Sequence, residues 1–342
     1  MTVALDATYS LGRHLTGVGA FSRALLFGLA AARTADRFLF CYRPHRFLAS
    51  LREALPANAS RRLLHEWTPI GSPLFHGLNQ RLPPRGFRRT VTTFHDLFVL
   101  TGDYSTPDFR RRFAAQAREA AAGSDLIVTV SHFTASQVDA LLNVPRARLR
   151  VVSHGVDLPS PAERAGPRES WFLHVGALQT RKNLLRLLFA FERTPPPWRL
   201  VLAGSDGFGA EHVHAAIAAS TARDRIDTLG YVDAPALRSL YSRASILVFP
   251  SLDEGFGMPV LEGMAWGMPV ITSNGSALAE VAGDAALLVA PTEVNEISEA
   301  MLRLIEDEPL RARLLQLGLQ RAAAHPWRNA IEGYWKVYRE LL

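Results

Sequence analysis

The sequence predicts an α/β protein built from two Rossmann-like domains, and three observations support this prediction. The chain has 342 residues, whereas single domains usually have roughly 100–150 residues. Short apolar strands alternate with amphipathic helices along both halves, which is typical of parallel sheets covered on both faces. A polar, proline-marked stretch over residues 159–167 separates the two series and is the predicted linker.

The elements follow in order. In the first half we expect strands over residues 3–7, 38–42, 91–94, 126–130 and 149–152, and helices over about 20–32 and 107–123. In the second half we expect strands over residues 171–175, 199–203, 226–229, 246–249, 270–272 and 286–289. A final helix over about 327–342 carries one apolar face, which requires a partner surface: Ile331, Tyr334, Trp335 and Tyr338. The predicted domains are residues 1–160 and 168–325, followed by the final helix over residues 326–342.

Composition and charge restrict the class of protein. Apolar content of 48% and charged content of 20% are ordinary for a soluble globular protein. No apolar run approaches the roughly 20 residues of a membrane span, the N-terminus lacks a signal-peptide pattern, and Cys41 is the only cysteine. We therefore expect a cytoplasmic protein without a disulfide framework or a multi-cysteine metal site.

The formal charge of +6 is uneven, since residues 1–160 carry +9 and residues 161–342 carry −3. Basic clusters lie at residues 85–89 and 110–112 of the first half. An anionic partner is expected for the first domain only, either anionic lipid headgroups or a lipid-diphosphate acceptor. Nucleic acid is the rival, but this half has no recognised nucleic-acid-binding module. Simple solvated faces are the other interpretation.

Two glutamates lie eight residues apart across a glycine-rich bend that opens a predicted helix. The segment reads Glu254-Gly255-Phe256-Gly257-Met258-Pro259-Val260-Leu261-Glu262. Pro259 suits a first helical turn, because its missing N–H would have no partner there. The exposed N–H groups at this helix start attract phosphate. Carboxylates repel phosphate, so we expect Glu254 and Glu262 to accept hydrogen bonds from sugar hydroxyls of a nucleotide sugar.

A second motif, Gly176-Ala177-Leu178-Gln179-Thr180-Arg181-Lys182-Asn183, puts two adjacent cations between a strand and a helix that Asn183 can cap. A departing diphosphate needs its growing charge stabilised, and a guanidinium with an ammonium can do this without a metal. No Asp-x-Asp motif occurs and the histidines lack metal-ligand spacing, so no metal or other cofactor is expected.

Two weaker motifs lie in the first half. His95 and Asp96 follow a predicted strand, and ligands of open α/β sheets bind at such strand ends. A loop holds Gly17-Val18-Gly19, but Ser22 stands where a dinucleotide fingerprint has its third glycine. An NAD-dependent dehydrogenase is therefore disfavoured. His154 and Asp157 are interpreted as structural or loop residues.

Together these motifs resemble those of glycosyltransferase family 4, a family of retaining enzymes with the GT-B fold. The segment 254–262 resembles the family's E-x7-E signature, and Arg181-Lys182-Asn183 resembles the R-K-N element of many mannosyltransferases of polysaccharide assembly. The resemblance implies two Rossmann-like domains facing each other across a cleft, with the last helix crossing back to the first domain. The chain departs from the family at Ala20-Phe21, where an Arg-Tyr pair is usual, so an acceptor contact there is in doubt.

The resemblance also implies roles for single residues. His95 would face the donor sugar, Arg181 and Lys182 would hold the diphosphate, and Glu254 would contact sugar hydroxyls. These four form the predicted catalytic set. The predicted donor-binding set contains the glycine loops, the residues that read the base and the glutamate that binds ribose: Gly17, Gly19, Gly176, Gly204, Tyr231, Val232, Gly255, Phe256, Gly257 and Glu262.

The predicted function is thus metal-independent, retaining transfer of a hexose from a nucleotide diphosphate sugar to a saccharide or lipid-linked saccharide acceptor. Mannose from GDP-mannose is favoured, while UDP-, dTDP- and other GDP-sugars remain open. The basic first domain would contact anionic membrane peripherally at its inner face. A front-face mechanism is favoured over a covalent intermediate. The alternative function is a non-catalytic nucleotide-sugar-binding protein of the same fold.

Overall fold

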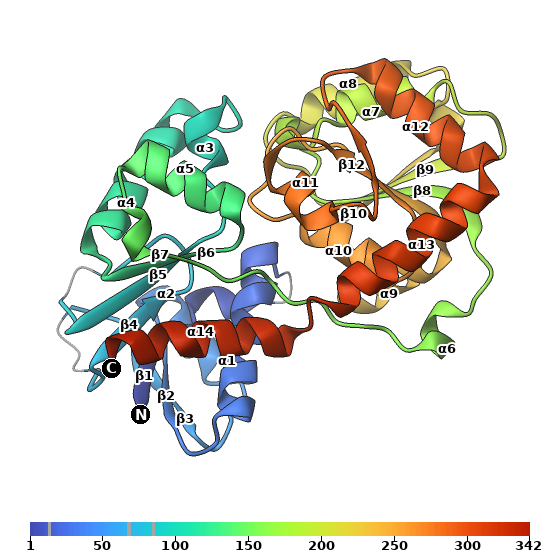
Figure 1. Cartoon of the computed structure of the whole chain (residues 1–342). Helices are drawn as coiled ribbons and strands as arrows, with labels where there is room; N and C mark the ends of the chain where they lie inside the picture. The colour runs from blue at the N-terminus through green and yellow to red at the C-terminus, as the bar shows by residue number, and fades with distance from the viewer. Residues whose placement is uncertain (13–14, 67–69, 84–85) are drawn as a thin grey trace. The chain divides into compact units, whose positions relative to one another are not determined.

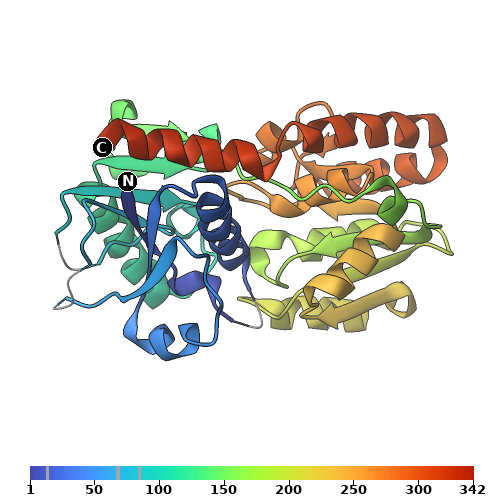
Figure 2. The ribbon, with the colours of Figure 1, turned by 90° about the horizontal axis from the view of Figure 1, so that it is seen from below.

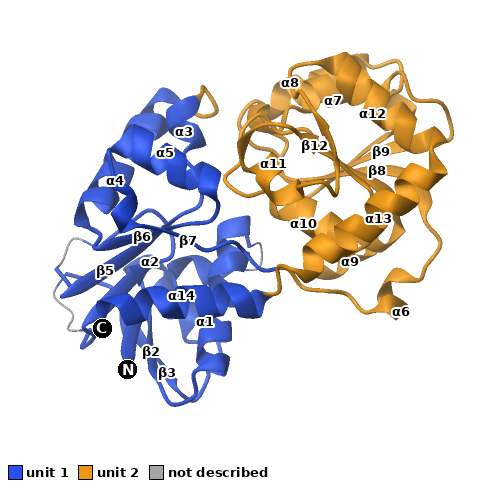
Figure 3. Cartoon of the chain, in the orientation of Figure 1, with its two compact units in different colours: residues 1–101, 106–155, 327–342 blue, residues 102–105, 156–326 orange. Residues whose placement is uncertain are grey.

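The computed structural model describes residues 1–12, 15–66, 70–83 and 86–342 (Figure 1). The chain divides into two compact units (Figure 3). Unit 1 comprises residues 1–101, 106–155 and 327–342, and unit 2 comprises residues 102–105 and 156–326. Each unit is built on one parallel β-sheet, which confirms the prediction of two Rossmann-like sheets.

In its described part, unit 1 has a seven-stranded parallel sheet in the order β3-β2-β1-β4-β5-β6-β7. The strands are β1 (Thr2–Asp6), β2 (Arg37–Tyr42), β3 (Ala59–Leu63), β4 (Leu74–Gly77), β5 (Arg89–Phe94), β6 (Leu126–Thr129) and β7 (Leu149–Val151). Strands β3 and β4 are absent from the sequence prediction. β3 carries Arg61 and Arg62 on a half-buried sheet edge, and β4 has only four residues, so neither shows a clear apolar run.

Helices cover this sheet on both faces. They are α1 (Gly17–Ala32), α2 (Pro44–Ser50), α3 (Phe98–Thr101), α4 (Pro107–Gly123), α5 (His132–Leu142) and α14 (Trp327–Leu341), with short 3-10 turns η1 (Thr8–Ser10) and η2 (Arg146–Arg148). Successive strand residues alternate between the faces: Val3 and Leu5 pack toward α1 and α14, whereas Ala4 belongs to the core on the opposite face.

The C-terminal helix α14 lies alongside α1 in both views (Figures 1 and 2). Its predicted apolar face, Ile331, Tyr334, Trp335 and Tyr338, is buried in the main core of unit 1. Gly28 of α1 permits the close approach, because a Cβ there would lie 2.4 Å from Ile331 Cδ1. The prediction that the last helix packs on the N-terminal part of the chain is confirmed.

A buried polar network also holds α14 on the sheet. His76 shares hydrogen bonds with Tyr338 Oη through Nδ1 (2.6 Å) and with Thr93 Oγ1 through Nε2 (2.9 Å). Thr93 Oγ1 in turn lies 3.2 Å from Tyr334 Oη. Burial lowers the pKa of His76 to about 3, so its imidazole is neutral at physiological pH.

This neutral histidine predicts acid-sensitive docking of α14. A folded pKa of about 3 lies below the ordinary value of 6.5, so His76 contributes its full stabilisation above about pH 6.5. That stabilisation is lost as the pH falls. We expect His76→Gln to lower the free energy of unfolding by about 1–2 kcal/mol at pH 7.5. Urea unfolding between pH 7.5 and 4.5 should show a shallower pH dependence for the variant than for the wild type. Equal slopes would contradict the assignment.

In the described chain, unit 2 has a six-stranded parallel sheet in the order β10-β9-β8-β11-β12-β13. The strands are β8 (Glu169–Val175), β9 (Arg199–Ala203), β10 (Ile226–Gly230), β11 (Ala244–Phe249), β12 (Val270–Ser273) and β13 (Leu287–Val289). Its helices are α6 (Pro161–Arg164), α7 (Leu184–Phe191), α8 (Ala210–Ala219), α9 (Ala234–Arg243), α10 (Met258–Ala265), α11 (Ser276–Ala282), α12 (Val294–Glu306) and α13 (Glu308–Ala323), with 3-10 turns η3 (Thr180–Lys182) and η4 (Arg223–Arg225).

The core of unit 2 fixes where its loops emerge. Residues of α7, α8 and α12 pack on one face of the sheet, and α10 packs on β11 and β12 from the other. Gly263 brings α10 close to the sheet, because a Cβ there would lie 2.9 Å from Leu247 Cδ2. The start of α10, where the glycine-rich bend lies, is therefore held next to the end of β11.

The predicted linker over residues 159–167 differs from the prediction in containing helix α6. Ser160 and Glu163 form a capping box, in which each side chain accepts from the other residue's backbone N–H. Such a short helix leaves no apolar periodicity to detect. Within the described residues, we find no helix whose length and apolar character would suffice to cross a bilayer.

Candidate active site

The chain order of unit 2 determines where a ligand can enter. β8 is the first strand of unit 2 in the sequence, and in the sheet it lies between β9 and β11. The strand order therefore reverses between β8 and β11. Ligands of such sheets bind outside the carboxyl ends of the strands at this reversal. The loop after β8 carries Gly176, Arg181 and Lys182, and the loop after β11 carries Glu254. Two segments about 70 residues apart in sequence therefore meet at one edge of the sheet.

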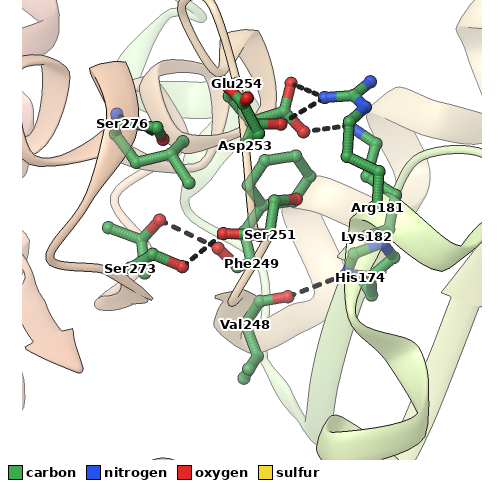
Figure 4. A network of polar contacts seen from close by, with 12 residues as sticks. His174, Arg181, Lys182, Val248, Phe249, Ser251, Asp253, Glu254, Ser273 and Ser276 are labelled. Carbon is green, nitrogen blue, oxygen red and sulfur yellow. Dashed lines mark hydrogen bonds and ion pairs between the residues drawn. The ribbon is translucent and has the colours of Figure 1, made fainter. Parts of the chain in front are cut away.

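Arg181, Lys182 and Glu254 form a buried ionic cluster at this edge (Figure 4). Arg181 Nη1 lies 2.7 Å from Glu254 Oε2, and Lys182 Nζ donates to Glu254 Oε1. Each of the three residues is 7% exposed. Burial alone would raise the pKa of Glu254, but the two cations outweigh it and hold this pKa at about 2. The cluster thus keeps a net positive charge at physiological pH.

Aromatic and backbone groups hold the two cations in place. Lys182 Nζ lies 4.6 Å from the centre of the Phe249 ring, and Arg181 Nη1 donates to Asp253 O at 2.5 Å. His174 stacks on Phe249 and lies 3.0 Å from Val248 O through Nδ1. Burial and the nearby Lys182 lower the pKa of His174 to about 4. Its neutral imidazole supports the cluster without adding charge.

The prediction that Asn183 caps the following helix is wrong. Asn183 has a left-handed backbone with φ of 60°, and its side chain makes no capping hydrogen bond with α7. Instead, Nδ2 donates to Pro250 O at 3.0 Å and to Pro291 O at 2.6 Å. The left-handed turn directs the amide away from the helix, where it joins the loop after β8 to the loop after β11.

Close backbone packing explains the glycines at the neighbouring strand ends. Gly176 N donates to Ala203 O at 2.9 Å, and Gly204 N donates to Gly230 O at 2.8 Å. A Cβ on Gly204 would lie 2.0 Å from Gly176 O, so no larger residue fits there. Gly176 itself has φ of +152°. These contacts bring the ends of β8, β9 and β10 together at the same edge.

Tyr231 and Val232 follow β10 at the outer side of this edge. Tyr231 is 40% exposed and Val232 is half-buried. Their backbone is therefore near the surface of unit 2, at the strand end next to Gly204.

The glycine-rich bend differs from the prediction in its exposure. Gly255, Phe256 and Gly257 are buried, not exposed. Gly257 ends the bend with φ of +94°, and α10 begins at Met258 with Pro259 in its first turn, as the sequence predicts.

Glu262 is the fifth residue of α10, just beyond that first turn. Burial raises its pKa above the ordinary value, and its Oε2 accepts a hydrogen bond of 2.6 Å from Tyr241 Oη. Glu254 and Glu262 are therefore not equivalent: the first is neutralised by cations and the second is held by a phenol.

The remaining predicted residues lie in unit 1. Gly17 and Gly19 belong to the first turn of α1, so the prediction of a loop at Gly17–Gly19 is wrong. Thr16 caps this helix by accepting from Gly19 N at 3.3 Å. A Cβ on Gly19 would lie 2.9 Å from Tyr9 O. The neighbouring Phe21 is 3% exposed and fills the core instead of presenting a group to a ligand.

His95 follows β5 and is buried in unit 1 at 8% exposure. Its Nε2 lies 2.9 Å from Leu78 O, and its ring packs against Phe21 and His154 with centroid distances of 4.7 and 5.4 Å. Burial lowers the pKa of His95 to about 4. The neutral ring therefore donates from Nε2 to Leu78 O and leaves Nδ1 as an acceptor.

The structure thus joins Arg181, Lys182 and Glu254 and places Gly176, Gly204, Tyr231 and Val232 along the same edge. Among the described residues, no group of three His, Cys, Asp or Glu side chains could hold a metal ion. The contacts of His174 and Tyr241 are not predicted by any sequence motif. A histidine in an apolar strand and a tyrosine 21 residues before Glu262 carry no local signal of their contacts.

Comparison with known proteins identifies the family of this chain. The model "Glycosyl transferases group 1" matches residues 161–320, and "Glycosyltransferase Family 4" matches residues 23–159. The O-antigen chain mannosyltransferase B of Escherichia coli is 31% identical, over 98% of this chain and 99% of that protein. This chain belongs to glycosyltransferase family 4. The D-rhamnosyltransferase WbpZ of Pseudomonas aeruginosa is 33% identical, over 55% of this chain and 51% of its own length.

Solved structures agree on the GT-B fold. Sucrose-phosphate synthase from Thermosynechococcus elongatus has a TM-score of 0.82 at 22% identity, covering 100% of this chain and 99% of its own. HepE of Anabaena, solved in complex with UDP and glucose, has a TM-score of 0.75 at 16% identity, covering 99% of both chains. These likenesses show that the chain shares the GT-B fold.

Proposed function

We propose that this glycosyltransferase moves mannose, with retention of configuration, from GDP-mannose to a saccharide or lipid-linked saccharide acceptor. The buried Arg181–Lys182–Glu254 cluster at the strand reversal of unit 2 is the observation that carries the proposal. The choice of mannose is supported by the similarity to the O-antigen mannosyltransferase B of Escherichia coli over nearly the full length of both chains.

The cluster suits a diphosphate leaving group. As the bond between sugar and diphosphate breaks, negative charge grows on the diphosphate oxygens, and fixed cations stabilise it. Arg181 and Lys182 are already desolvated and held by Glu254, Phe249 and Asp253, so little reorganisation is needed during the reaction. We assign the diphosphate to these two residues.

Glu254 would contact hydroxyls of the donor sugar through the outer lone pairs of its carboxylate. Both of its oxygens are engaged, Oε2 by Arg181 and Oε1 by Lys182. A carboxylate neutralised in this way is a poor nucleophile, because its negative charge is shared with two cations. This supports the front-face route, in which no covalent intermediate forms on Glu254.

The other predicted residues are proposed to contribute to donor binding. Glu262 would accept hydrogen bonds from the ribose, and the backbone at Tyr231 and Val232 would read the base. Gly255, Phe256 and Gly257 would line the diphosphate side. Gly17 and Gly19 of unit 1 remain predicted donor-binding residues. The neutral His95 would accept a hydrogen bond from a donor-sugar hydroxyl through Nδ1, and it is not an acid near pH 7.

Release of nucleoside diphosphate from a panel of nucleotide sugars tests this function. The panel contains GDP-mannose and other GDP-, UDP- and dTDP-sugars, each with and without mixed bacterial lipid extract. We expect turnover of GDP-mannose that requires the extract and that Glu262→Ala abolishes. Turnover of a different donor would overturn the choice of mannose. GDP binding without any transfer would support the non-catalytic nucleotide-sugar-binding alternative, and the absence of nucleotide binding would overturn both.

We further propose that unit 1 meets an anionic membrane surface through a basic pocket. The pocket has a volume of about 880 Å³. Its lining holds two carboxylates, Glu119 and Asp125, and four arginines, Arg43, Arg81, Arg88 and Arg112, so positive charge is in excess. Arg88 and Arg112 come from the two basic clusters of the sequence, whose Arg85 lies outside the described residues. Leu82 and Phe87 add apolar surface. Cationic and apolar groups together suit phosphate headgroups of lipids.

Vesicle binding tests this surface. We expect the wild type to sediment with vesicles of phosphatidylglycerol and not with those of phosphatidylcholine. Arg88→Gln with Arg112→Gln should weaken this binding about 5- to 30-fold, because each cation near the surface contributes about 1 kcal/mol. Arg52→Gln, an exposed arginine of the same unit outside the pocket, is the matched control. An equal loss in the control would contradict a specific role for the pocket.

A further inference from the structure

The phenol of Tyr241 is buried beside Glu262, the residue proposed to bind the ribose. Tyr241 lies in α9, is 2% exposed and stacks on Trp266 with an interplanar angle of 10°. Its hydroxyl donates to Glu262 Oε2 at 2.6 Å, a short, charge-assisted hydrogen bond. A buried phenol without a partner is costly, and here its partner is the carboxylate expected to bind ribose.

The helices that carry the pair are fixed to each other. Arg168 donates through Nη1 to Tyr241 O at 3.2 Å and through Nη2 to Trp266 O at 2.5 Å. One guanidinium thereby ties the end of α9 to the residue that follows α10. The distance between Tyr241 Oη and the Glu262 carboxylate is therefore set by the backbone of both helices, not by side-chain freedom alone.

The hydrogen bond leaves one carboxylate oxygen for a ligand. The phenol has one proton to donate, and Glu262 Oε2 receives it. Within the described chain, no hydrogen bond or ion pair engages Oε1 of Glu262. Asp157, the other charged group that influences Glu262, is an anion and cannot donate to it. A carboxylate fixed at one oxygen has a defined orientation for the other.

We propose that Tyr241 is a positioning residue that orients the Glu262 carboxylate toward the ribose hydroxyls and so determines preference for ribonucleotides over those lacking the hydroxyls. This inference rests on the proposed function, which gives Glu262 the ribose. Without the phenol, the carboxylate would turn about its side-chain bonds, and the hydroxyls would meet a mobile acceptor instead of a preorganised one. A site built to accept hydrogen bonds from hydroxyls discriminates strongly against ligands that lack them.

Paired nucleotides provide the test. Calorimetric dissociation constants are measured for GDP and 2′,3′-dideoxy-GDP, and for UDP and 2′,3′-dideoxy-UDP, with wild type, Tyr241→Phe, Glu262→Gln and the double variant. We expect the wild type to bind the ribonucleotide about 10- to 100-fold more tightly than the dideoxynucleotide. The loss of hydrogen bonds to a charged group typically lowers affinity by about this factor. Tyr241→Phe should reduce the preference to a few-fold while leaving dideoxynucleotide affinity within about twofold.

The outcomes separate this inference from the proposed function. A wild type that binds both members of a pair equally would overturn the ribose role of Glu262 itself. A wild type that discriminates, with Tyr241→Phe discriminating equally, would overturn only the role of Tyr241. Equal weakening of both ligands would also overturn it, because that pattern indicates a purely structural residue. Both ligands are measured on one preparation, so partial unfolding of a variant affects them alike.

A double-variant cycle adds a second readout. If the phenol acts through the carboxylate, Tyr241→Phe should change ribonucleotide affinity less than twofold once Glu262 is already glutamine. A full effect of Tyr241→Phe in the Glu262→Gln background would show an independent action of the tyrosine and would contradict the inference.

Discussion

Glu254→Gln is expected to lower kcat/KM for sugar transfer by about 10²–10³-fold, the usual loss when one preorganised polar contact to the transition state is removed. The substitution keeps the size of the side chain and removes its charge. Arg181 and Lys182 would then lie buried without their anion. The two cations would then repel each other and change orientation. The decrease in kcat/KM would therefore exceed that caused by the missing sugar contact alone.

The same substitution should also destabilise unit 2 in the absence of nucleotide. Removing one partner of a buried ion pair costs about 3–5 kcal/mol, because the remaining charge is uncompensated. A pKa of about 2, below the ordinary 4.5, means that Glu254 contributes fully above about pH 4.5 and less as the pH falls toward 2. Chemical unfolding at pH 7 measures the loss, with the exposed Glu299→Gln as the matched control.

Nucleotide binding distinguishes the two effects of Glu254→Gln. A nucleoside diphosphate should restore much of the lost stability, since its own anion replaces the carboxylate beside Arg181 and Lys182. Stability and activity unchanged from the wild type would contradict the role assigned to the cluster.

Periodic elements were the part of the fold that the sequence could predict. The helix α4 begins and ends where the apolar spacing and its flanking residues indicate, at Pro107 and Gly123. β3 could not be predicted in this way, because its two adjacent arginines, Arg61 and Arg62, lie on a sheet edge that is only half-buried. The start of α1 could not be predicted from its glycines, because Gly17 and Gly19 are typical of a loop. The Thr16 cap places both glycines in the first turn of the helix instead.

The site was predictable in its residue types but not in its pairing. Local motifs gave Arg181, Lys182 and Glu254 separate roles, whereas their ion pairs depend on β8 and β11 being neighbours. Strands β9 and β10 intervene along the chain, so this adjacency belongs to the sheet order and not to any local pattern. The contact from Tyr241 to Glu262 depends likewise on how α9 packs beside α10.

The second large effect is expected for Lys182→Ala, which should lower kcat by about 10²–10³-fold with a smaller change in KM. Charge on the diphosphate increases as the bond to the sugar breaks, so the ammonium is worth more in the transition state than in the bound donor. The chain has one other lysine, and Lys336→Ala on the exposed side of α14 is therefore the matched control. Steady-state kinetics with the active donor measures both variants. An increase in KM with unchanged kcat would contradict the proposed leaving-group role.

Combining the two substitutions tests whether the cluster acts as one unit. If Glu254 serves partly by holding Lys182, the loss in the Lys182→Ala, Glu254→Gln double variant should be well below the product of the single losses. The double variant also removes one buried cation along with the anion, so its free energy of unfolding should lie closer to the wild type than that of Glu254→Gln. Multiplicative kinetic losses would show that the lysine and the glutamate contact the donor independently. Their ion pair would then contribute to the stability of unit 2 without coupling their catalytic roles.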